Sequence, residues 1–597
     1  MENRKFKELK IMKRLNIFIF SFFSILCLSS CVDTVIIPDS KTVDEDFWKS
    51  KSDVQLMVNG AYQSMMTEAV MERLIVWGGL RSDEMIPIDN ITGDIRDDLR
   101  DINLANIQAD NMYAKWGAIY GVINKCNVVL EKAGAVLEED PSYTEGDYQA
   151  DRAQMLALRA LCHFYLVRNF RDVPLTTVAF MNSSQDYYLP QSAPLTVLEQ
   201  CINDLKEAEN NAILASAYAD WQRVGVLTRD GIQSILADIY LWRASVLHSQ
   251  ADYDQAVAYC DKVIASKKSQ HVFKRGESKI EKDYYLAEGK DMFREMFIGQ
   301  NAEESIFEIQ SDGDNNPNLA VCKYFAHYSG TRDPYLFASN RYQYTGAVYT
   351  VSGYTRDWRG SMNTYATEKT VGDFTGLQIR KFVSSNSSFS PNSTDTRDSE
   401  VRAYSTKYQQ NYVIYRLTDV MLMKAEALIA KAALQAGEGT VSTDYSTEVK
   451  SLISTAFDIV KEVNSRAREA TTSTILPATY ATIEKMEDLI LGERARELAF
   501  EGKRWYDLLR YNYRHIEGVD YATTLATQSE QGKQFVTTYN PMLDFVKNKL
   551  AGKGNAVTAK MDNEAKLYMP VPLVDLNVNP NLRQNPVYGS TDTYSKK

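Results

Sequence analysis

Four charged residues near the C-terminal end of the sequence occupy positions where an amphipathic helix would carry apolar side chains. Residues three or four positions apart lie on one face of a helix. On the face that begins at Ile490, the next positions are charged, and apolar residues follow again at Trp505 and Leu508. The charged residues on or beside this face are Arg494, Glu497, Glu501 and Arg504.

Two kinds of chemistry suit these charges. Glycosidases use two carboxylates about 5 to 10 Å apart on either side of the scissile bond, but Glu497 and Glu501 share one helical turn among arginines. A buried charge costs several kcal/mol unless it is paired and hydrogen-bonded. We therefore predict that the four residues form an internal ion network, which has a structural rather than a catalytic role.

The segment 324–365 is rich in aromatic residues and is the first candidate for a binding surface. It contains 11 aromatic residues in 42 positions, whereas aromatics make up 11% of the whole chain. Aromatic faces stack on the C–H faces of sugar rings, and they also suit peptides or protein interfaces. The alternative is that the rings pack the insertion onto the helices. The candidate ligand residues are Trp358, Tyr342, Tyr344, Tyr349, Tyr354, Arg356 and Asp357.

No other pattern in the sequence is typical of an enzyme or a cofactor site. The chain lacks Gly-x-Ser-x-Gly, His-Glu-x-x-His and phosphate-loop motifs, and its five histidines are separated in sequence. Residues 312–316 offer oxygen ligands but lack the spacing and closing glutamate of a calcium loop, so we expect a polar turn. We expect no enzymatic activity, no cofactor and no metal.

The elements that must position these residues are mostly helices in pairs. Apolar periodicity predicts helices over residues 112–133, 154–170, 195–210, 234–247, 253–266, 415–432 and 449–468. Alanines at the predicted contacts of the 234–247 and 253–266 pair are typical of tetratricopeptide-like repeats. We expect a mostly α chain with helical pairs at about 112–270 and 410–515. The ligand-loop insertion at about 275–400 should contain a small β-hairpin near residues 340–354.

Five stretches, in the same order along nearly the whole chain, resemble the SusD/RagB family. They are residues 45–62, 158–175, 415–427 and 493–510, and the Pro-rich and Asn-rich closing segment 567–588. The resemblance implies a tetratricopeptide-like superhelix that acts as a scaffold for long loops. It also implies a surface protein that binds an oligosaccharide and delivers it to a SusC-like TonB-dependent transporter. A peptide-binding or protein-interaction module that serves the same kind of transporter is the alternative.

The resemblance adds a second candidate site, because the segment after the first helix of these proteins often reaches the ligand face. Here that segment contains Trp77, Arg81 and Asp83, and an acidic loop at residues 89–101 follows it. The loop lacks aromatic residues, unlike a starch-type stacking platform. Arg81 and Asp83 are therefore either ligand contacts or buried partners.

The N-terminus predicts an exported lipoprotein. Lys13 and Arg14 precede an apolar stretch that ends in Leu28-Ser-Ser-Cys31, which resembles a lipobox. The stretch 15–28 is shorter than the roughly 20 residues that span a bilayer. A plain secretory signal or a short buried helix is the alternative. We expect a signal peptide over residues 1–30 with a start at Met12, lipid on Cys31, and a single body over 31–597 that the lipid alone anchors to the outer membrane at the cell surface.

Composition agrees with a large exported body that does not bind nucleic acid. The chain has 597 residues, 44% of them hydrophobic, and a formal net charge of −11. Loss of residues 1–30 would leave 61 basic and 76 acidic residues, a charge of −15, which disfavours polyanionic partners. The five cysteines after Cys31 include no Cys-x-x-Cys pair, so we predict buried free thiols.

Overall fold

The computed structural model describes most of the chain after its N-terminal segment. Its internal contacts divide it into Met1–Lys49 and Ser50–Lys597, and all the named helices and strands lie in the second unit. The expected lipid site at Cys31 lies outside the described residues. The described residues are 47–88, 93–182, 184–275, 286–287, 289–326, 334–342, 357–371, 374–383, 408–437, 439–468, 475–516, 540–549, 554–561 and 564–588.

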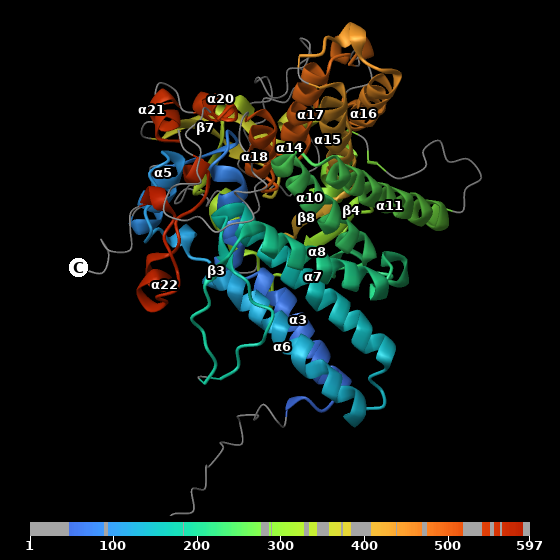
Figure 1. The fold of residues 1–597 in the computed structure, drawn as a ribbon, viewed down its shortest axis with the longest axis vertical. Helices are drawn as coiled ribbons and strands as arrows, with labels where there is room; N and C mark the ends of the chain where they lie inside the picture. Colours follow the sequence, from blue (N-terminus) through green and yellow to red (C-terminus); the bar gives the residue numbers. More distant parts are fainter. Residues whose placement is uncertain are drawn as a thin grey trace, which may run out of the picture. The chain divides into compact units, whose positions relative to one another are not determined.

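Long helices that follow one another and pack side by side form the N-terminal part of the second unit (Figure 1). Helix α7 is its centre, because it packs against both α6 and α8, and every residue from Ala153 to Phe170 is buried. A capping box between Thr144 and Asp147 fixes its first turn. The helices are α3 (Lys51–Met65), α4 (Glu68–Ile75), the π-helix η1 (Val76–Leu80), α5 (Asp94–Asn103), α6 (Gly117–Glu139), α7 (Glu145–Phe170), α8 (Pro194–Asn211), α10 (Arg229–Leu247) and α11 (Gln250–Arg275).

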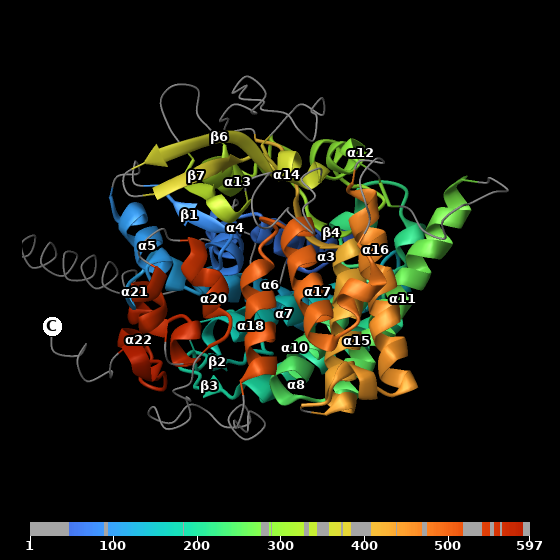
Figure 2. The same ribbon diagram turned by 90° about the horizontal axis from the view of Figure 1, so that it is seen from above.

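The C-terminal helices continue the same packing, as α11 contacts α15 and α15 contacts α16 (Figure 2). Alanines at the α15–α16 contact let the two helices approach closely around Phe457. These helices are α15 (Leu417–Ala436), α16 (Thr447–Arg466), α17 (Ile483–Glu497) and α18 (Arg504–His515). The predicted mostly α fold class is confirmed.

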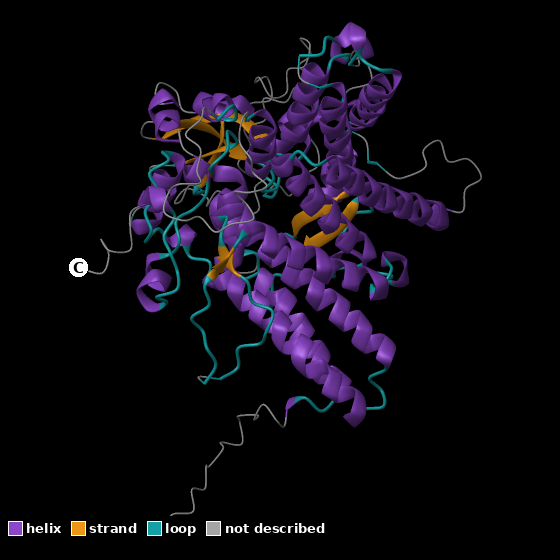
Figure 3. Cartoon of the chain, viewed as in Figure 1, coloured by secondary structure: helices purple, strands orange, loops and turns teal. Residues whose placement is uncertain are grey.

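The strands are few and short (Figure 3). A four-stranded antiparallel sheet has the order β1 (Met85–Pro87), β5 (Leu336–Ser339), β7 (Phe374–Ile379) and β6 (Thr364–Val371). Two strand pairs join β2 (Val173–Pro174) to β3 (Gln191–Ser192), and β4 (Ser305–Ile309) to β8 (Tyr412–Arg416). The hairpin in the described part of the insertion is β6–β7, whereas residues 343–354 of the predicted hairpin lie outside the described residues.

Short helices connect these elements and form much of the C-terminal segment. They include α9 (Gln222–Gly225), α12 (Lys290–Phe293), α13 (Leu319–Phe325), α14 (Trp358–Asn363), α20 (Leu543–Val546), α21 (Gly554–Thr558), η10 (Ala559–Met561), η11 (Glu564–Leu567), α22 (Leu573–Val578) and η12 (Pro586–Tyr588).

Three further observations bear on the sequence-based expectations. The acidic segment 89–101 is not simply a loop, because α5 begins at Asp94 and buries Leu99 and Ile102. In the described part of the chain, no helix is long and apolar enough to cross a membrane. The free cysteines predicted to be buried are so, at Cys126, Cys162, Cys201, Cys260 and Cys322.

Candidate functional site

Glu497 lies at the centre of a buried ion network. Its carboxylate accepts hydrogen bonds from Arg416 at 2.5 Å, from Arg359 at 2.9 Å and from Arg466. Burial alone would raise its pKa, but the three guanidinium groups hold the pKa of Glu497 well below its usual value. The carboxylate is thus a fixed anion among cations, and no free oxygen remains for acid–base chemistry.

The other three predicted members of the network are also buried and paired. Glu501 accepts from Lys381 at 2.6 Å and from Arg416 at 2.9 Å. Arg494 binds Asp419 and Asp507, each at 2.9 Å, and Arg504 binds Asp83 at 2.8 Å. The four residues do not share one helix as expected, because α17 ends at Glu497 and Glu501 lies in the turn before α18. Their bonds join α17, this turn and α18 to the loop after η1, to the residues after β7 and to the start of α15. The charges therefore clamp segments that are distant in sequence.

The aromatic insertion offers less binding surface than its composition predicts. Tyr342 is completely buried, with its ring centroid 5.6 Å from that of Phe500, so a role in stacking on a ligand is wrong for this residue. Asp357 is buried as the N-cap of α14 and as the partner of Arg359, so its expected role in binding hydroxyl groups is also wrong. The insertion contributes residues to the ion network, among them Asp357, and these residues are therefore buried.

Trp358 remains the aromatic candidate of that insertion in the described part of the chain. It is half-buried at the start of α14, where its backbone N–H donates to the Ala467 carbonyl at 2.9 Å and its ring lies beside Gly289. The candidates Tyr344, Tyr349, Tyr354 and Arg356 lie outside the described residues.

Two of the three candidates after the first helices are structural. Trp77 is buried, and its indole N–H donates to the Tyr113 carbonyl at 2.8 Å. Asp83 is buried between Arg504 and Arg341. The prediction of ligand contact is therefore wrong for Trp77 and Asp83, because packing and ion pairing already use both side chains.

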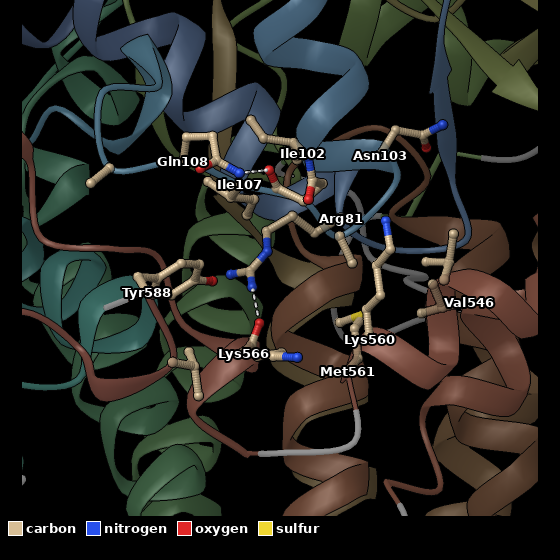
Figure 4. Close-up of a pocket in the computed structure, with 15 residues that line it drawn as sticks. Arg81, Ile102, Asn103, Ile107, Gln108, Val546, Lys560, Met561, Lys566 and Tyr588 are labelled. Carbon is tan, nitrogen blue, oxygen red and sulfur yellow. Dashed lines mark hydrogen bonds between the residues drawn. The ribbon is translucent and has the colours of Figure 1, made fainter. Parts of the chain in front are cut away.

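Arg81 differs from them because it lines a cavity of about 380 Å³. Figure 4 shows this pocket, hereafter the Arg81 cavity, between the turn that follows α5 and the C-terminal segments. Polar side chains and a wall of aliphatic side chains both face it. The lining residues are Arg81, Ile102, Asn103, Ala105, Asn106, Ile107, Gln108, Ala109, Val546, Val557, Lys560, Met561, Lys566, Val587 and Tyr588.

The guanidinium of Arg81 has unused hydrogen-bonding capacity. It lies 4.3 Å from the centre of the Trp505 ring, and its Nη2 donates to the Lys566 carbonyl at 3.0 Å. Its Nη1 is buried without a hydrogen-bond partner among the described residues. Burial lowers the pKa of Arg81 to about 10, so the group is still a cation at neutral pH.

Asn103 repeats this pattern on the opposite element. The residue is buried, and neither its amide nitrogen nor its amide oxygen has a hydrogen-bond partner within the described parts of the chain. A buried polar group without a partner costs about 1 to 3 kcal/mol. Both atoms are inaccessible to solvent, and Figure 4 shows the side-chain amide directed away from Arg81, so Asn103 forms part of the cavity wall.

Two further grooves lie elsewhere on the unit. One, of about 350 Å³, has the exposed Trp221 beside Asp312 and Asn315. Oδ1 of Asp312 accepts the backbone N–H groups of residues 314–316, so the predicted polar turn is confirmed. The other, of about 340 Å³, includes the exposed Tyr187 and Tyr188. The described residues contain no group of three or more potential metal ligands.

Sequence reasoning missed most of the Arg81 cavity. Asn103, Gln108 and Lys560 carry no local signal, because the elements that hold them meet only after the chain has folded. Their common feature is a position in short turns and helices outside the repeated helix pairs.

Comparison with known proteins gives matches along most of the chain. A family model described as "SusD family" matches residues 248–588, and one described as "Starch-binding associating with outer membrane" matches residues 37–241. SusD-like protein P38 of Formosa agariphila is 24% identical over 526 residues, which cover 84% of this chain and 92% of that protein.

Solved structures share the fold at low sequence identity. A SusD superfamily protein from Bacteroides vulgatus gives a TM-score of 0.62 at 17% identity, over 91% of this chain and all of the other. A laminarin binding SusD-like protein gives 0.57 at 18% identity, over 90% and 99% of the two chains. The first family model alone spans more than half of the sequence, so the predicted resemblance is confirmed and the chain belongs to the SusD family.

Proposed function

We propose that this protein is a cell-surface lipoprotein that binds an oligosaccharide in the Arg81 cavity and delivers it to a partner TonB-dependent transporter of the outer membrane. The observation that carries the proposal is a preformed cavity lined by polar and aliphatic side chains, among them Arg81, whose Nη1 has no hydrogen-bond partner in the described structure. Oligosaccharides are rich in oxygen atoms that both donate and accept. The starch-binding family description and the laminarin-binding relative support this ligand class.

A binding role fits the charges better than catalysis does. Glu497 and Glu501, the pair that resembles a glycosidase pair in sequence, are both held in buried ion pairs. No Asp or Glu is among the described residues that line the Arg81 cavity, so this part of its lining supplies no carboxyl group to act as acid or base.

The cavity suggests how a sugar would be held. The ring of the half-buried Tyr588 and the aliphatic side chains of Ile107 and Val587 offer apolar surface to C–H groups. Gln108 is exposed, and its amide nitrogen donates to the Asn106 carbonyl at 2.9 Å, which holds the side chain at the cavity. Polar groups fix the orientation of a ligand, and apolar walls supply contact area.

Calorimetric titration of the full-length protein in detergent tests the ligand class. The probes are laminarihexaose, acidic oligosaccharides of similar length and a mixed peptide library. We expect binding of at least one oligosaccharide, and a loss of about tenfold in affinity for Gln108→Ala, which removes an exposed hydrogen-bonding side chain that lines the cavity. Asn211→Ala, at the exposed end of α8, is the matched control. Binding of peptides alone would contradict the proposal and favour the peptide-binding alternative.

Anchoring and delivery are tested in cells. Cys31→Ala should abolish labelling with radioactive palmitate and release the protein from the membrane fraction, because Leu28-Ser-Ser-Cys31 is the proposed attachment site. Uptake of a fluorescent cognate oligosaccharide should then fall. Uptake that continues without the transporter encoded beside this protein would contradict delivery to that transporter.

A further inference from the structure

Three of the side chains that line the Arg81 cavity are cationic, and none of its described lining residues is acidic. The cations are Arg81, Lys560 and Lys566, and Figure 4 shows them distributed around the cavity. The chain as a whole has a net charge of −11. The cavity is therefore lined by positive charge although the protein as a whole is negatively charged. Such a site favours ligands of negative charge.

Arg81 is buried without a carboxylate partner in the described structure, unlike the arginines of the ion network. Its side chain is 4% exposed, yet it makes one hydrogen bond, to the Lys566 carbonyl. The network arginines Arg359, Arg416, Arg466, Arg494, Arg504 and Arg510 each contact at least one buried carboxylate.

Arg73 shows what a satisfied buried arginine without a carboxylate looks like. Its guanidinium donates to three backbone carbonyls, those of Ala69, Met112 and Lys115. Arg81 has one such carbonyl, and its Nη1 has no partner among the described residues. The difference leaves Arg81, a residue that lines the cavity, with an unused donor at Nη1.

The carboxyl groups close to Arg81 in sequence cannot meet that need. Asp83 is already bound by Arg504 and Arg341. Burial raises the pKa of Glu84 to about 8, so that its carboxyl is mostly neutral at pH 7. Lys549, buried nearby, donates to the Leu80 carbonyl at 2.6 Å and adds no negative charge.

We infer that the oligosaccharide bound in the Arg81 cavity carries acidic groups, carboxylate or sulfate, one of which pairs with Arg81 while Lys560 contributes at the exposed rim. The inference rests on the proposed function and specifies its substrate class. A guanidinium presents parallel N–H groups that match two oxygens of a carboxylate or sulfate. Lys560 is exposed, and its bond to the Leu104 carbonyl is long, at 3.3 Å, so its ammonium group can approach a second acidic group.

Titration of the full-length protein with three probes of similar length tests the inference. They are laminarihexaose, which is neutral, a hexameric oligogalacturonate, which carries carboxylates, and a carrageenan hexasaccharide, which carries sulfates. We expect one acidic probe to bind at least about tenfold more tightly than the neutral one, because hydrogen bonds to charged groups are the stronger ones. Raising NaCl from 50 to 500 mM should weaken that binding by several-fold. The two acidic probes separate carboxylate from sulfate recognition.

Single substitutions test which residues cause the preference for acidic over neutral oligosaccharides. Arg81→Gln should bring the affinities for acidic and neutral probes to within about threefold of each other, and Lys560→Gln should reduce the difference partially. Lys485→Gln, an exposed lysine on α17, is the matched control and should change nothing. Circular dichroism checks that Arg81→Gln is folded. If Arg81→Gln is not folded, the Lys560→Gln variant and the NaCl series test the inference instead. Lys560 lies at the surface, so its substitution should leave the fold intact.

The outcomes separate the inference from the proposed function. Equal or tighter binding of laminarihexaose, insensitive to salt, would overturn the acidic substrate class and leave oligosaccharide binding in place. An acidic preference that survives both Arg81→Gln and Lys560→Gln would overturn the assignment to this cavity. A failure of all three probes to bind would count against the proposed function itself, and the inference would fail with it.

Discussion

The ion network and the Arg81 cavity are two buried charged regions that meet opposite requirements. In the network, cations and carboxylates satisfy one another, as Glu497 does with three arginines. In the cavity, Arg81 lacks a carboxylate partner, and the side-chain amide of Asn103 lacks a hydrogen-bond partner, among the described residues. A buried charge that the protein itself has paired stabilises a unique fold, whereas one that it leaves unpaired is available to a ligand. Burial of charge therefore has a different meaning in each region.

The largest effect should come from removing an anion from the network. Glu497→Gln leaves Arg359, Arg416 and Arg466 without their shared carboxylate, and we expect the free energy of unfolding to fall by about 3 to 5 kcal/mol. Denaturant titration measures this change. Glu448→Gln, on the exposed start of α16, is the control. A loss below about 1 kcal/mol would show that the buried ion pairs of the network stabilise the protein no more than exposed ion pairs do.

The network should also make the protein sensitive to acid. Burial opposes ionisation, but arginine and lysine partners lower the pKa of Glu493 from 4.5, and that of Asp419 from 3.8, to about 2 in each case. The unfolded chain takes up these protons first as the pH falls, so stability should decrease between pH 4.5 and 2.

Denaturant midpoints measured at pH steps across that range test the prediction. Glu493→Gln should start from a lower stability and decline less steeply, because one of the titrating groups is gone. An identical slope for the wild type and the variant would be inconsistent with titration of Glu493.

Glu84, three residues after Arg81 in the sequence, should affect the pH dependence of stability in the opposite direction to Glu493 and Asp419. Burial raises the pKa of Glu84 from 4.5 to about 8, so the unfolded chain loses this proton before the folded protein does. Its contribution to stability should therefore decrease as the pH rises from 4.5 to 8. Glu84→Gln should remove that loss and be more stable, relative to the wild type, at pH 8 than at pH 5. If the free energies of unfolding of the wild type and Glu84→Gln differ by the same amount at pH 5 and pH 8, the pKa of Glu84 is not raised in the folded protein.

The smallest effect on stability is expected at Arg81 itself. Arg81→Met removes a buried charge without leaving a carboxylate unpaired in the described structure, so the free energy of unfolding should change by less than about 1 kcal/mol. Loss of the preference for acidic over neutral oligosaccharides should accompany this small change. Denaturant titration and calorimetry of the same sample measure both, and a destabilisation as large as that of Glu497→Gln would remove the contrast between the two regions.

The fold was more predictable from the sequence than the site was. Helix periodicity depends on residues three or four positions apart, so the long helices from α6 to α16 are visible locally. The misplaced candidates Tyr342 and Asp357 are residue types typical of binding surfaces, but contacts distant in sequence bury them. Tyr342 packs against Phe500, and Asp357 pairs with the neighbouring Arg359, which binds Glu493 and Glu497. Exposure depends on those contacts, and aromatic composition does not reveal them.

The sequence by itself indicated that the charges at Arg494, Glu497, Glu501 and Arg504 need buried partners. The single helical stripe from which this was predicted is wrong, because α17 ends at Glu497, Glu501 lies in the turn that follows, and α18 begins at Arg504. The sequence also determined the family through ordered local motifs. Only the tertiary structure decided which partner each charge has, such as Asp83 for Arg504, 421 positions away. It alone decided that Arg81 would face a cavity shared with Asn103 and Lys560. The physical reason is that pairing and cavity formation depend on distances in space, which spacing along the chain does not encode beyond a helical turn.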